Sequence, residues 1–130
     1  MAGELILIVE DNEKNRKLVR DVLQFKGYQT VESETGEEGV RLAQELRPAL
    51  VLMDIQLPGI DGITALGRLR EDPTTREIPV IAVTASAMTH DRQKIMASGF
   101  DGYQSKPINV KSFLAAVREM LDRPRSRGAA

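Results

Sequence analysis

The sequence predicts an α/β fold in which five parallel strands alternate with five helices. Three short, continuous apolar runs occupy residues 5–9, 49–53 and 79–83. Such runs are typical of strands that are buried on both faces of a parallel sheet. Amphipathic helical stripes lie between and after these runs, which completes a βα alternation. The chain has 130 residues, of which 42% are hydrophobic and 28% charged, so we expect one globular domain.

The helices are predicted from apolar residues at helical spacing, each stripe covering one face of the sheet. The stripes are Leu18, Val19, Val22 and Leu23; Val40, Ala43 and Leu46; Ile63, Leu66 and Leu69; and Val110, Phe113, Leu114, Val117 and Leu121. Gly27, Pro48 and Pro73 follow the first three stripes as stop signals. Weaker patterns predict strands at 28–32 and 102–104 and a helix at 87–98.

The alternation implies right-handed crossovers and favours a flavodoxin-like (βα)5 three-layer sandwich with strand order 2-1-3-4-5. Ligands of such sheets bind at the carboxyl ends of the strands, where the strand order reverses. Glu10 and Asp11 follow the first strand, and Asp54 follows the third. Thr84 and Lys106 follow the fourth and fifth strands. We therefore expect these five side chains at one edge of the sheet.

Three carboxylates in one pocket repel one another, and a hard divalent cation relieves that repulsion. Mg²⁺ suits a site with few carboxylates and with phosphate oxygens nearby. The Thr84 hydroxyl and the Lys106 ammonium would then bind oxygens of a phosphoryl group. The alternative interpretation is that these acidic residues are helix N-caps or solvated loop residues.

Composition excludes several other kinds of chemistry. The chain has no Cys and one His, His90, which argues against disulfides, Cys–zinc sites and Ser-His-Asp hydrolysis. A net charge of −1 gives no overall affinity for nucleic acid or an anionic membrane. The apolar runs are too short to span a bilayer, and we expect a cytoplasmic protein. Residues 123–130 are predicted to be a flexible basic tail.

The segments that carry these residues resemble response-regulator receiver domains of two-component signalling, which are bacterial phosphoproteins. The motifs are LIVEDN at 7–12, LMDIQLPG at 52–59, VTA at 83–85 and GYQSKP at 102–107. Within that family the chain looks most like stand-alone receivers of the DivK type. The resemblance implies a receiver domain over residues 1–122, with no output domain in this chain.

The resemblance also implies a role for each matching residue. Asp54 would accept a phosphoryl group from phosphohistidine of a histidine kinase or phosphotransfer protein. Asp11, Asp54 and the backbone carbonyl of Gln56 would bind Mg²⁺, and Glu10 would act mainly through water. Thr84 and Lys106 would bind phosphoryl oxygens. The Lys106–Pro107 peptide bond would be cis.

Signalling in the family implies a switch rather than an enzyme with a separate substrate. Tyr103 matches the aromatic residue that moves when the threonine is drawn to the phosphoryl group. The output face would comprise the fourth helix, fifth strand and fifth helix and contact a downstream effector. Exposed candidates on that face are Met88, His90, Lys94, Ile108 and Lys111. Gln56 and Ser86 would tune the lifetime of the acyl phosphate.

Three alternatives remain open from the sequence. The chain could be a receiver module excised from a hybrid histidine kinase. It could be a Mg²⁺-dependent aspartyl phosphohydrolase, although Gln56 stands where such enzymes place a second Asp as the general acid. An FMN carrier on the same fold is disfavoured, because Glu10 and Asp11 would repel a phosphate. With one His in the chain, the phosphohistidine must belong to another protein or to another part of a longer chain.

Overall fold

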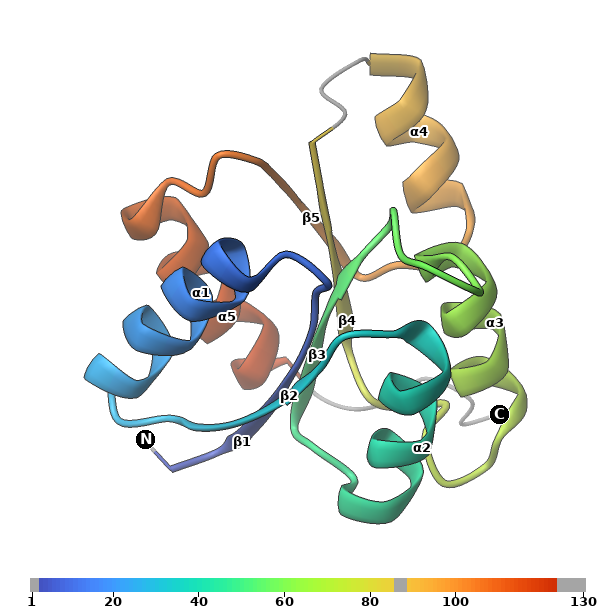
Figure 1. Ribbon diagram of the computed structural model, residues 1–130, viewed down its shortest axis with the longest axis horizontal. Helices are drawn as coiled ribbons and strands as arrows, with labels where there is room; N and C mark the ends of the chain where they lie inside the picture. Colours follow the sequence, from blue (N-terminus) through green and yellow to red (C-terminus); the bar gives the residue numbers. More distant parts are fainter. Residues whose placement is uncertain (1–2, 86–88, 124–130) are drawn as a thin grey trace.

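The computed structural model describes residues 3–85 and 89–123, and strands and helices alternate along them (Figure 1). The strands are β1 (Leu5–Val9), β2 (Gln29–Ser33), β3 (Leu50–Asp54), β4 (Val80–Thr84) and β5 (Gly102–Ser105). The helices are α1 (Glu13–Phe25), α2 (Gly36–Leu46), α3 (Gly62–Glu71), α4 (Thr89–Ala97) and α5 (Val110–Asp122). The predicted α/β class and alternation are confirmed. Met88, Ser86 and the tail beyond residue 123 lie outside the described residues.

The strands form one parallel sheet in the order β2-β1-β3-β4-β5, as predicted. In the register, Val9 at the end of β1 pairs with Met53 in β3, and Asp54 pairs with Val83. The residue after β1 therefore lies beside the last residue of β3. This register brings the carboxyl ends of β1, β3 and β4 to one edge of the sheet.

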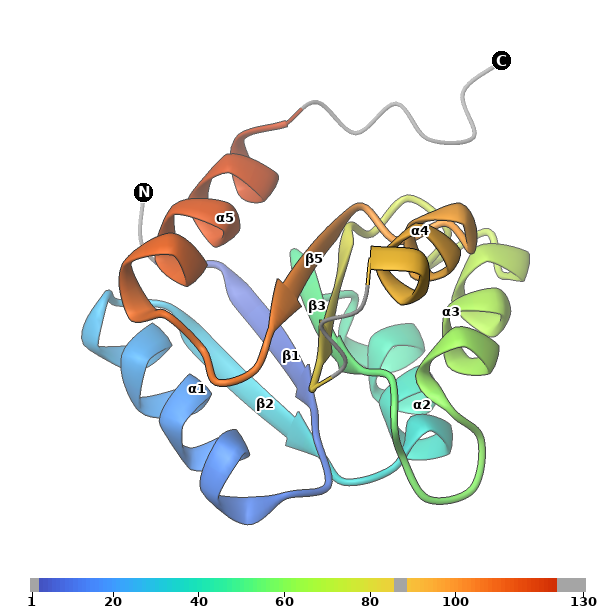
Figure 2. The same ribbon diagram turned by 90° about the horizontal axis from the view of Figure 1, so that it is seen from above.

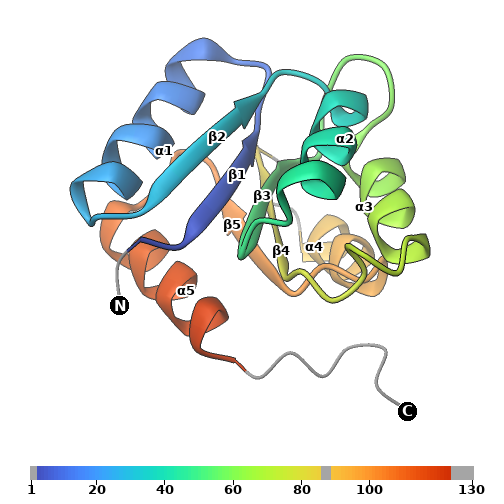
Figure 3. The same cartoon turned by 90° about the horizontal axis from the view of Figure 1, so that it is seen from below.

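Helices cover both faces of the sheet, which gives three layers (Figures 1 and 2). Helices α1 and α5 lie on one face, and α2, α3 and α4 lie on the other. Figure 3 shows β2 at one edge of the sheet beside β1. Two apolar cores fill the spaces between the layers, one that includes Phe113 and one that includes Leu66 and Met53. Within the described part of the chain, no helix is long and apolar enough to cross a membrane.

The apolar stripes predict the buried helix faces correctly except at three residues that are exposed. Leu23, Leu69 and Val117 are buried, as the stripes predict. In contrast, Leu18, Leu46 and Val110 have exposed fractions of 42%, 45% and 43%. Leu46 is the last residue of α2, and Val110 is the first residue of α5. Leu18 lies near the middle of α1, beside the buried Val19. Apolar spacing identifies the face of a helix but not how far the sheet extends beneath it.

Candidate functional site

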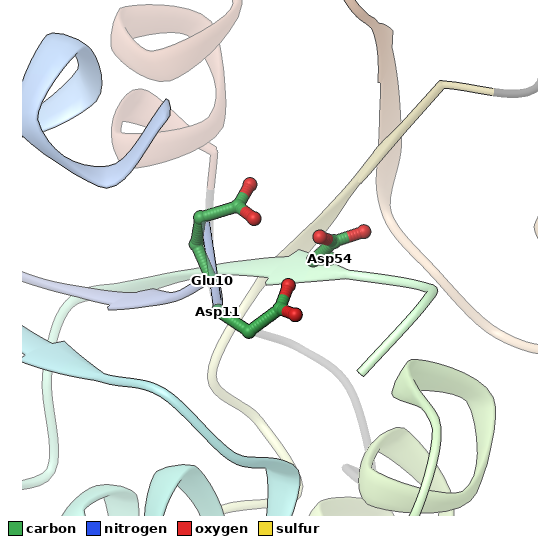
Figure 4. A group of neighbouring side chains, drawn as sticks. All are labelled: Glu10, Asp11 and Asp54. Carbon is green, nitrogen blue, oxygen red and sulfur yellow. The ribbon is translucent and has the colours of Figure 1, made fainter. Parts of the chain in front are cut away.

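Three carboxylates meet at the carboxyl ends of β1 and β3. Glu10 and Asp11 follow β1, and Asp54 is the last residue of β3. One carboxylate oxygen from each residue lies within 4.8 Å of the other two. Figure 4 shows the Glu10 and Asp11 side chains extending from the same loop towards Asp54. Glu10 and Asp54 are each 4% exposed, whereas Asp11 is exposed.

Neither Glu10 nor Asp11 caps helix α1, so the helix-cap part of the alternative interpretation is wrong for these two residues, whereas Asp11 is an exposed loop residue. The N-cap of α1 is Asn12, whose side chain accepts a hydrogen bond from the backbone N–H of Asn15. Asn12 in turn donates its own N–H to Oε2 of Glu10 at 3.1 Å. The loop between β1 and α1 therefore caps the helix with an amide and leaves the Asp11 carboxylate available to a cation.

Lys106 supplies the positive charge of the site from the loop after β5. Its Nζ lies 2.7 Å from Oε1 of Glu10 and 3.1 Å from Oδ2 of Asp54. The peptide bond between Lys106 and Pro107 is cis, as the sequence resemblance implies. Lys106 therefore bridges two of the three carboxylates.

Burial raises the pKa of the Glu10 carboxyl to about 7, and the neighbouring Asp54 carboxyl acts in the same direction. Hydrogen bonds from Lys106 and from the Asn12 N–H oppose this shift. Burial by itself would lower the pKa of Lys106, but its hydrogen bonds to Glu10 and Asp54 outweigh burial and raise that pKa. Lys106 therefore stays charged at neutral pH, and one of the carboxylates around it remains easy to protonate.

The backbone around Asp54 is held close to helix α3. Oδ1 of Asp54 accepts a hydrogen bond from the Gln56 N–H at 3.1 Å, and the Gly62 N–H donates to the carbonyl of Ile55 at 2.9 Å. A Cβ atom on Gly62 would overlap the Asp54 carbonyl oxygen and the Cα of Ile55. Gly62 is thus the residue that allows α3 to approach the end of β3. The predicted role of the Gln56 carbonyl in metal binding stays a prediction.

Thr84 and Tyr103 lie on the β4 and β5 side of the site. Thr84 is buried and ends β4, opposite Ser105 at the end of β5. Tyr103 is half-buried and packs against the core on the α2–α4 face of the sheet. The guanidinium carbon of Arg92, from α4, lies 5.5 Å from the centre of the Tyr103 ring. Thr84 and Tyr103 thus lie on neighbouring strands, and their role as a switch pair stays a prediction.

The expected output face is described only in part. Lys94 and Lys111 are exposed, as predicted, whereas Ile108 is half-buried and packs against the core on the α1–α5 face. The side chain of His90 lies outside the described residues, as do Met88 and Ser86. The predictions for these three residues therefore stay untested.

One site residue was missed from the sequence. Arg16, in α1, donates from Nη1 to the backbone carbonyl of Glu10 at 2.9 Å. A signal was present, because Arg16 is four residues after the N-cap Asn12 and so lies one turn into the helix, beside the same loop. The contact itself could not be predicted, however, because every residue has a main-chain oxygen and the acceptor is therefore independent of residue type.

The donor set fits a hard divalent cation. Carboxylate oxygens are the ligands that Mg²⁺ takes from proteins, and Mg²⁺ typically keeps several waters while using one or two carboxylates. Glu10, Asp11 and Asp54 offer three such groups on one side of the sheet edge. Asp11 faces solvent, which leaves room for water ligands. The residues present could therefore hold Mg²⁺.

The comparisons with known proteins identify the family. The model of the response regulator receiver domain matches residues 6–118. The chain belongs to the response-regulator receiver family. This receiver is 47% identical over 116 residues to the polar-differentiation response regulator DivK of Brucella anthropi, which covers 89% of this chain and 94% of that protein. It is 46% identical to DivK of Brucella ovis over the same shares.

Solved receiver structures have the same fold. The receiver domain of a sensor histidine kinase from Pseudomonas aeruginosa has a TM-score of 0.87 and 32% identity, covering 94% of this receiver and all of that chain. That structure has a magnesium ion coordinated in its active-site cleft. The receiver domain of a histidine kinase from Syntrophus aciditrophicus has a TM-score of 0.85 and 30% identity, covering 98% of this receiver and 99% of that chain. The flavodoxin-like fold and the two-component family are therefore established.

Proposed function

We propose that this receiver is a phosphorelay switch in which Asp54 accepts a phosphoryl group from phosphohistidine of a histidine kinase or histidine phosphotransfer protein. The observation that supports this most directly is the position of the Asp54 carboxylate. It ends β3, is 4% exposed, and lies within contact of the Lys106 ammonium and close to the carboxylates of Glu10 and Asp11. A nucleophile flanked by a cation and by metal-ligating oxygens is the arrangement that phosphoryl transfer requires.

The transfer is a substitution at phosphorus. An Asp54 carboxylate oxygen attacks the phosphorus atom, and the new O–P bond forms as the P–N bond to the donor histidine breaks. The imidazole nitrogen keeps the electron pair of the broken bond and takes a proton from solvent. The hydrogen bond from the Gln56 N–H to Oδ1 orients the carboxylate before attack.

Lys106 and Thr84 would bind the transferred group. Lys106 already contacts Oδ2 of Asp54, so a short movement of its ammonium group would place it on a phosphoryl oxygen. Thr84 ends the neighbouring strand, one residue beyond the Val83 that pairs with Asp54, and its hydroxyl would donate to another phosphoryl oxygen. Both contacts offset negative charge that builds up during transfer.

Mg²⁺ held by Asp11, Asp54 and the backbone carbonyl of Gln56, with Glu10 acting mainly through water, would neutralise charge on the phosphoryl oxygens. The similar kinase receiver from Pseudomonas aeruginosa has magnesium in its cleft, which supports this choice of metal. Because Glu10 and Lys106 form an ion pair, the bound cation would also release Lys106 for the phosphoryl group. The receiver would thus assist its own phosphorylation and dephosphorylation without turning over a separate substrate.

The phosphorylated receiver would signal through a changed protein-binding surface. Tyr103 in β5 lies on the sheet edge next to Thr84's strand, so a shift of Thr84 towards the phosphoryl group would open space for the ring. The face formed by α4, β5 and α5, with Lys94 and Lys111 exposed on it, would bind the effector. We propose that the receiver binds its kinase and its effector in the bacterial cytoplasm.

Phosphorylation by acetyl phosphate tests the proposal. We expect the wild type to gain a phosphoryl group in the presence of Mg²⁺ but not with excess EDTA, measured by intact mass. Asp54→Asn should abolish the mass gain while circular dichroism shows an unchanged fold. Asp61→Asn is the matched control, because Asp61 lies in the same loop and caps α3, a role that Asn fills equally well. An undiminished mass gain in Asp54→Asn would contradict the proposal.

A further inference from the structure

We propose that Arg16 is a positioning residue for the divalent cation, acting through the main chain of Glu10 rather than by touching the cation or its ligand atoms. This inference rests on the proposed function, since it concerns the same acidic cluster. Arg16 lies in α1, four residues after the helix N-cap, and its side chain is 15% exposed.

The guanidinium group of Arg16 joins three elements. Nη1 donates to the carbonyl oxygen of Glu10 at 2.9 Å, and Nε donates to Oε1 of Glu32 at 3.1 Å. Glu32 belongs to β2, and Glu10 follows β1. The donors of a guanidinium group form a rigid planar fork, so two bonds in different directions fix its orientation. Arg16 therefore ties α1, β2 and the loop after β1 together.

The Glu10 carbonyl belongs to the peptide group that connects Glu10 to Asp11, and this is where the contact matters. The N–H of Glu10 is fixed separately, by a 2.9 Å hydrogen bond to the carbonyl of Ser33. Across residues 3–85 and 89–123, no donor binds the Asp11 carboxylate. The backbone at Asp11 therefore sets the direction in which its side chain leaves the main chain. Arg16 holds the peptide plane that aims Asp11 at Asp54.

The charges around Arg16 explain how a cation can serve a metal site without repelling the metal. Glu32 binds Arg16 directly, and Oε1 of Glu34 lies 4.0 Å from Nη1. Arg20 also pairs with Glu32, at 3.3 Å, but the structure gives it no contact with Glu10. The two arginines and two glutamates thus form a neutral group beside the acidic cluster.

Positioning and simple electrostatics predict opposite results when Arg16 loses its charge. Removing a nearby cation should strengthen Mg²⁺ binding if the charge alone mattered. Removing the residue that orients a ligand should weaken it, because outer-shell partners of metal ligands typically contribute 10- to 100-fold in affinity. The sign of the change therefore separates the two explanations.

The test is a Mg²⁺ titration followed by the backbone amide signals in ¹H–¹⁵N NMR spectra, which report affinity and folding in the same sample. We expect Arg16→Met to weaken Mg²⁺ binding by about tenfold. Arg16→Lys keeps the charge but lacks the planar fork, and should fall between Arg16→Met and the wild type. Arg20→Met is the matched control, since Arg20 shares Glu32 but does not reach Glu10, and its affinity should stay at the wild-type value.

The double variant Arg16→Met with Glu32→Gln covers the case in which Arg16→Met fails to fold, because it removes the charge of a half-buried carboxylate that has lost one of its two arginine partners. It should show the same weakening. Equal or tighter Mg²⁺ binding in the folded Arg16 variants would overturn the inference and leave the proposed function intact. A wild type whose spectrum does not respond to Mg²⁺ would instead contradict the metal site itself, and both proposals with it.

Discussion

The Lys106 ammonium lies 2.7 Å from the Glu10 carboxylate, although β3 and β4 lie between the strands that these residues follow. The long lysine side chain reaches this distance across the edge of the sheet, passing Asp54, which it also contacts. Lys106 thereby neutralises part of the charge that a divalent cation would neutralise. A bound divalent cation would therefore be an alternative counter-charge to the ammonium group for the same buried carboxylates.

Lys106→Met should destabilise the receiver most when no divalent cation is present. The change leaves the buried carboxylates of Glu10 and Asp54 without their ammonium partner, which should cost about 3 kcal/mol in the free energy of unfolding. Urea unfolding at about pH 8 with EDTA measures this loss. Added Mg²⁺ should restore part of it, because it supplies the missing positive charge.

Lys111→Met is the control for that prediction. Lys111 is an exposed lysine at the start of α5, and the described structure gives it no ion pair. Its removal should leave the free energy of unfolding within about 0.5 kcal/mol of the wild type. Equal effects of the two substitutions, or no recovery of Lys106→Met with Mg²⁺, would show that Lys106 is not a counter-charge to the cluster.

The stability of the metal-free receiver should depend on pH through Glu10. The folded-state pKa of Glu10, about 7, lies above its ordinary value of 4.5, so the folded protein binds this proton more tightly than the unfolded chain does. That contribution to stability is complete below the ordinary pKa and is lost as the pH rises through the folded-state pKa. We therefore expect the stabilising contribution of Glu10 to the free energy of unfolding to decrease as the pH rises from about 5 to about 8.

Glu10→Gln isolates this effect, because the amide is neutral throughout. In EDTA, the free energy of unfolding of the wild type should therefore fall relative to that of Glu10→Gln as the pH rises across this range, as measured by urea unfolding. Mg²⁺ binding to the wild type should show the opposite dependence and strengthen with pH, since the metal competes with the proton for the carboxylate. Parallel pH profiles in the two proteins would contradict the shifted pKa of Glu10.

The sequence predicts the strands and the acidic cluster of this protein, but not the contacts that depend on side-chain conformation or on main-chain atoms. The strands begin and end within about one residue of the apolar runs, because a strand buried on both faces must be continuously apolar. Glu10, Asp11 and Asp54 were brought together by strand order alone. The Lys106–Glu10 ion pair was not predicted, because it depends on the rotamer of a long side chain. The Arg16 contact was missed because its acceptor is a main-chain oxygen.

Two phenylalanines illustrate the same limit at the level of packing and allow a simple test. Phe113 in α5 is completely buried, whereas Phe25 at the end of α1 is 87% exposed. Phe25 lies at an apolar groove of about 290 Å³ lined also by Val22, Val110 and Leu114. Phe113→Ala should cost about 3–5 kcal/mol in the free energy of unfolding. Phe25→Ala should change it by less than about 0.5 kcal/mol, and similar losses by urea unfolding would show that Phe25 packs in the folded state.

Two glycines in helix α3 should respond to alanine in opposite directions. A Cβ on Gly62 would overlap the backbone of Asp54 and Ile55, whereas a Cβ on Gly67 meets no atom within 4 Å. Gly67→Ala should stabilise the receiver by about 0.5–1 kcal/mol, because alanine loses less backbone entropy than glycine in a helix. Gly62→Ala should destabilise it by about 1–3 kcal/mol through overpacking against the main chain.

The Gly62 substitution should also disturb the functional site, because the backbone that it displaces belongs to Asp54, whose carboxylate lies in that site. We expect slower phosphorylation of Gly62→Ala by acetyl phosphate, measured by intact mass under conditions where the variant is fully folded. Gly67→Ala should be phosphorylated at the wild-type rate, since Gly67 is exposed on the outer side of α3. A Gly62→Ala protein that is both as stable and as quickly phosphorylated as the wild type would show that α3 can move away from β3 without cost. The close approach of α3 to the end of β3 would then not be what holds Asp54 in place.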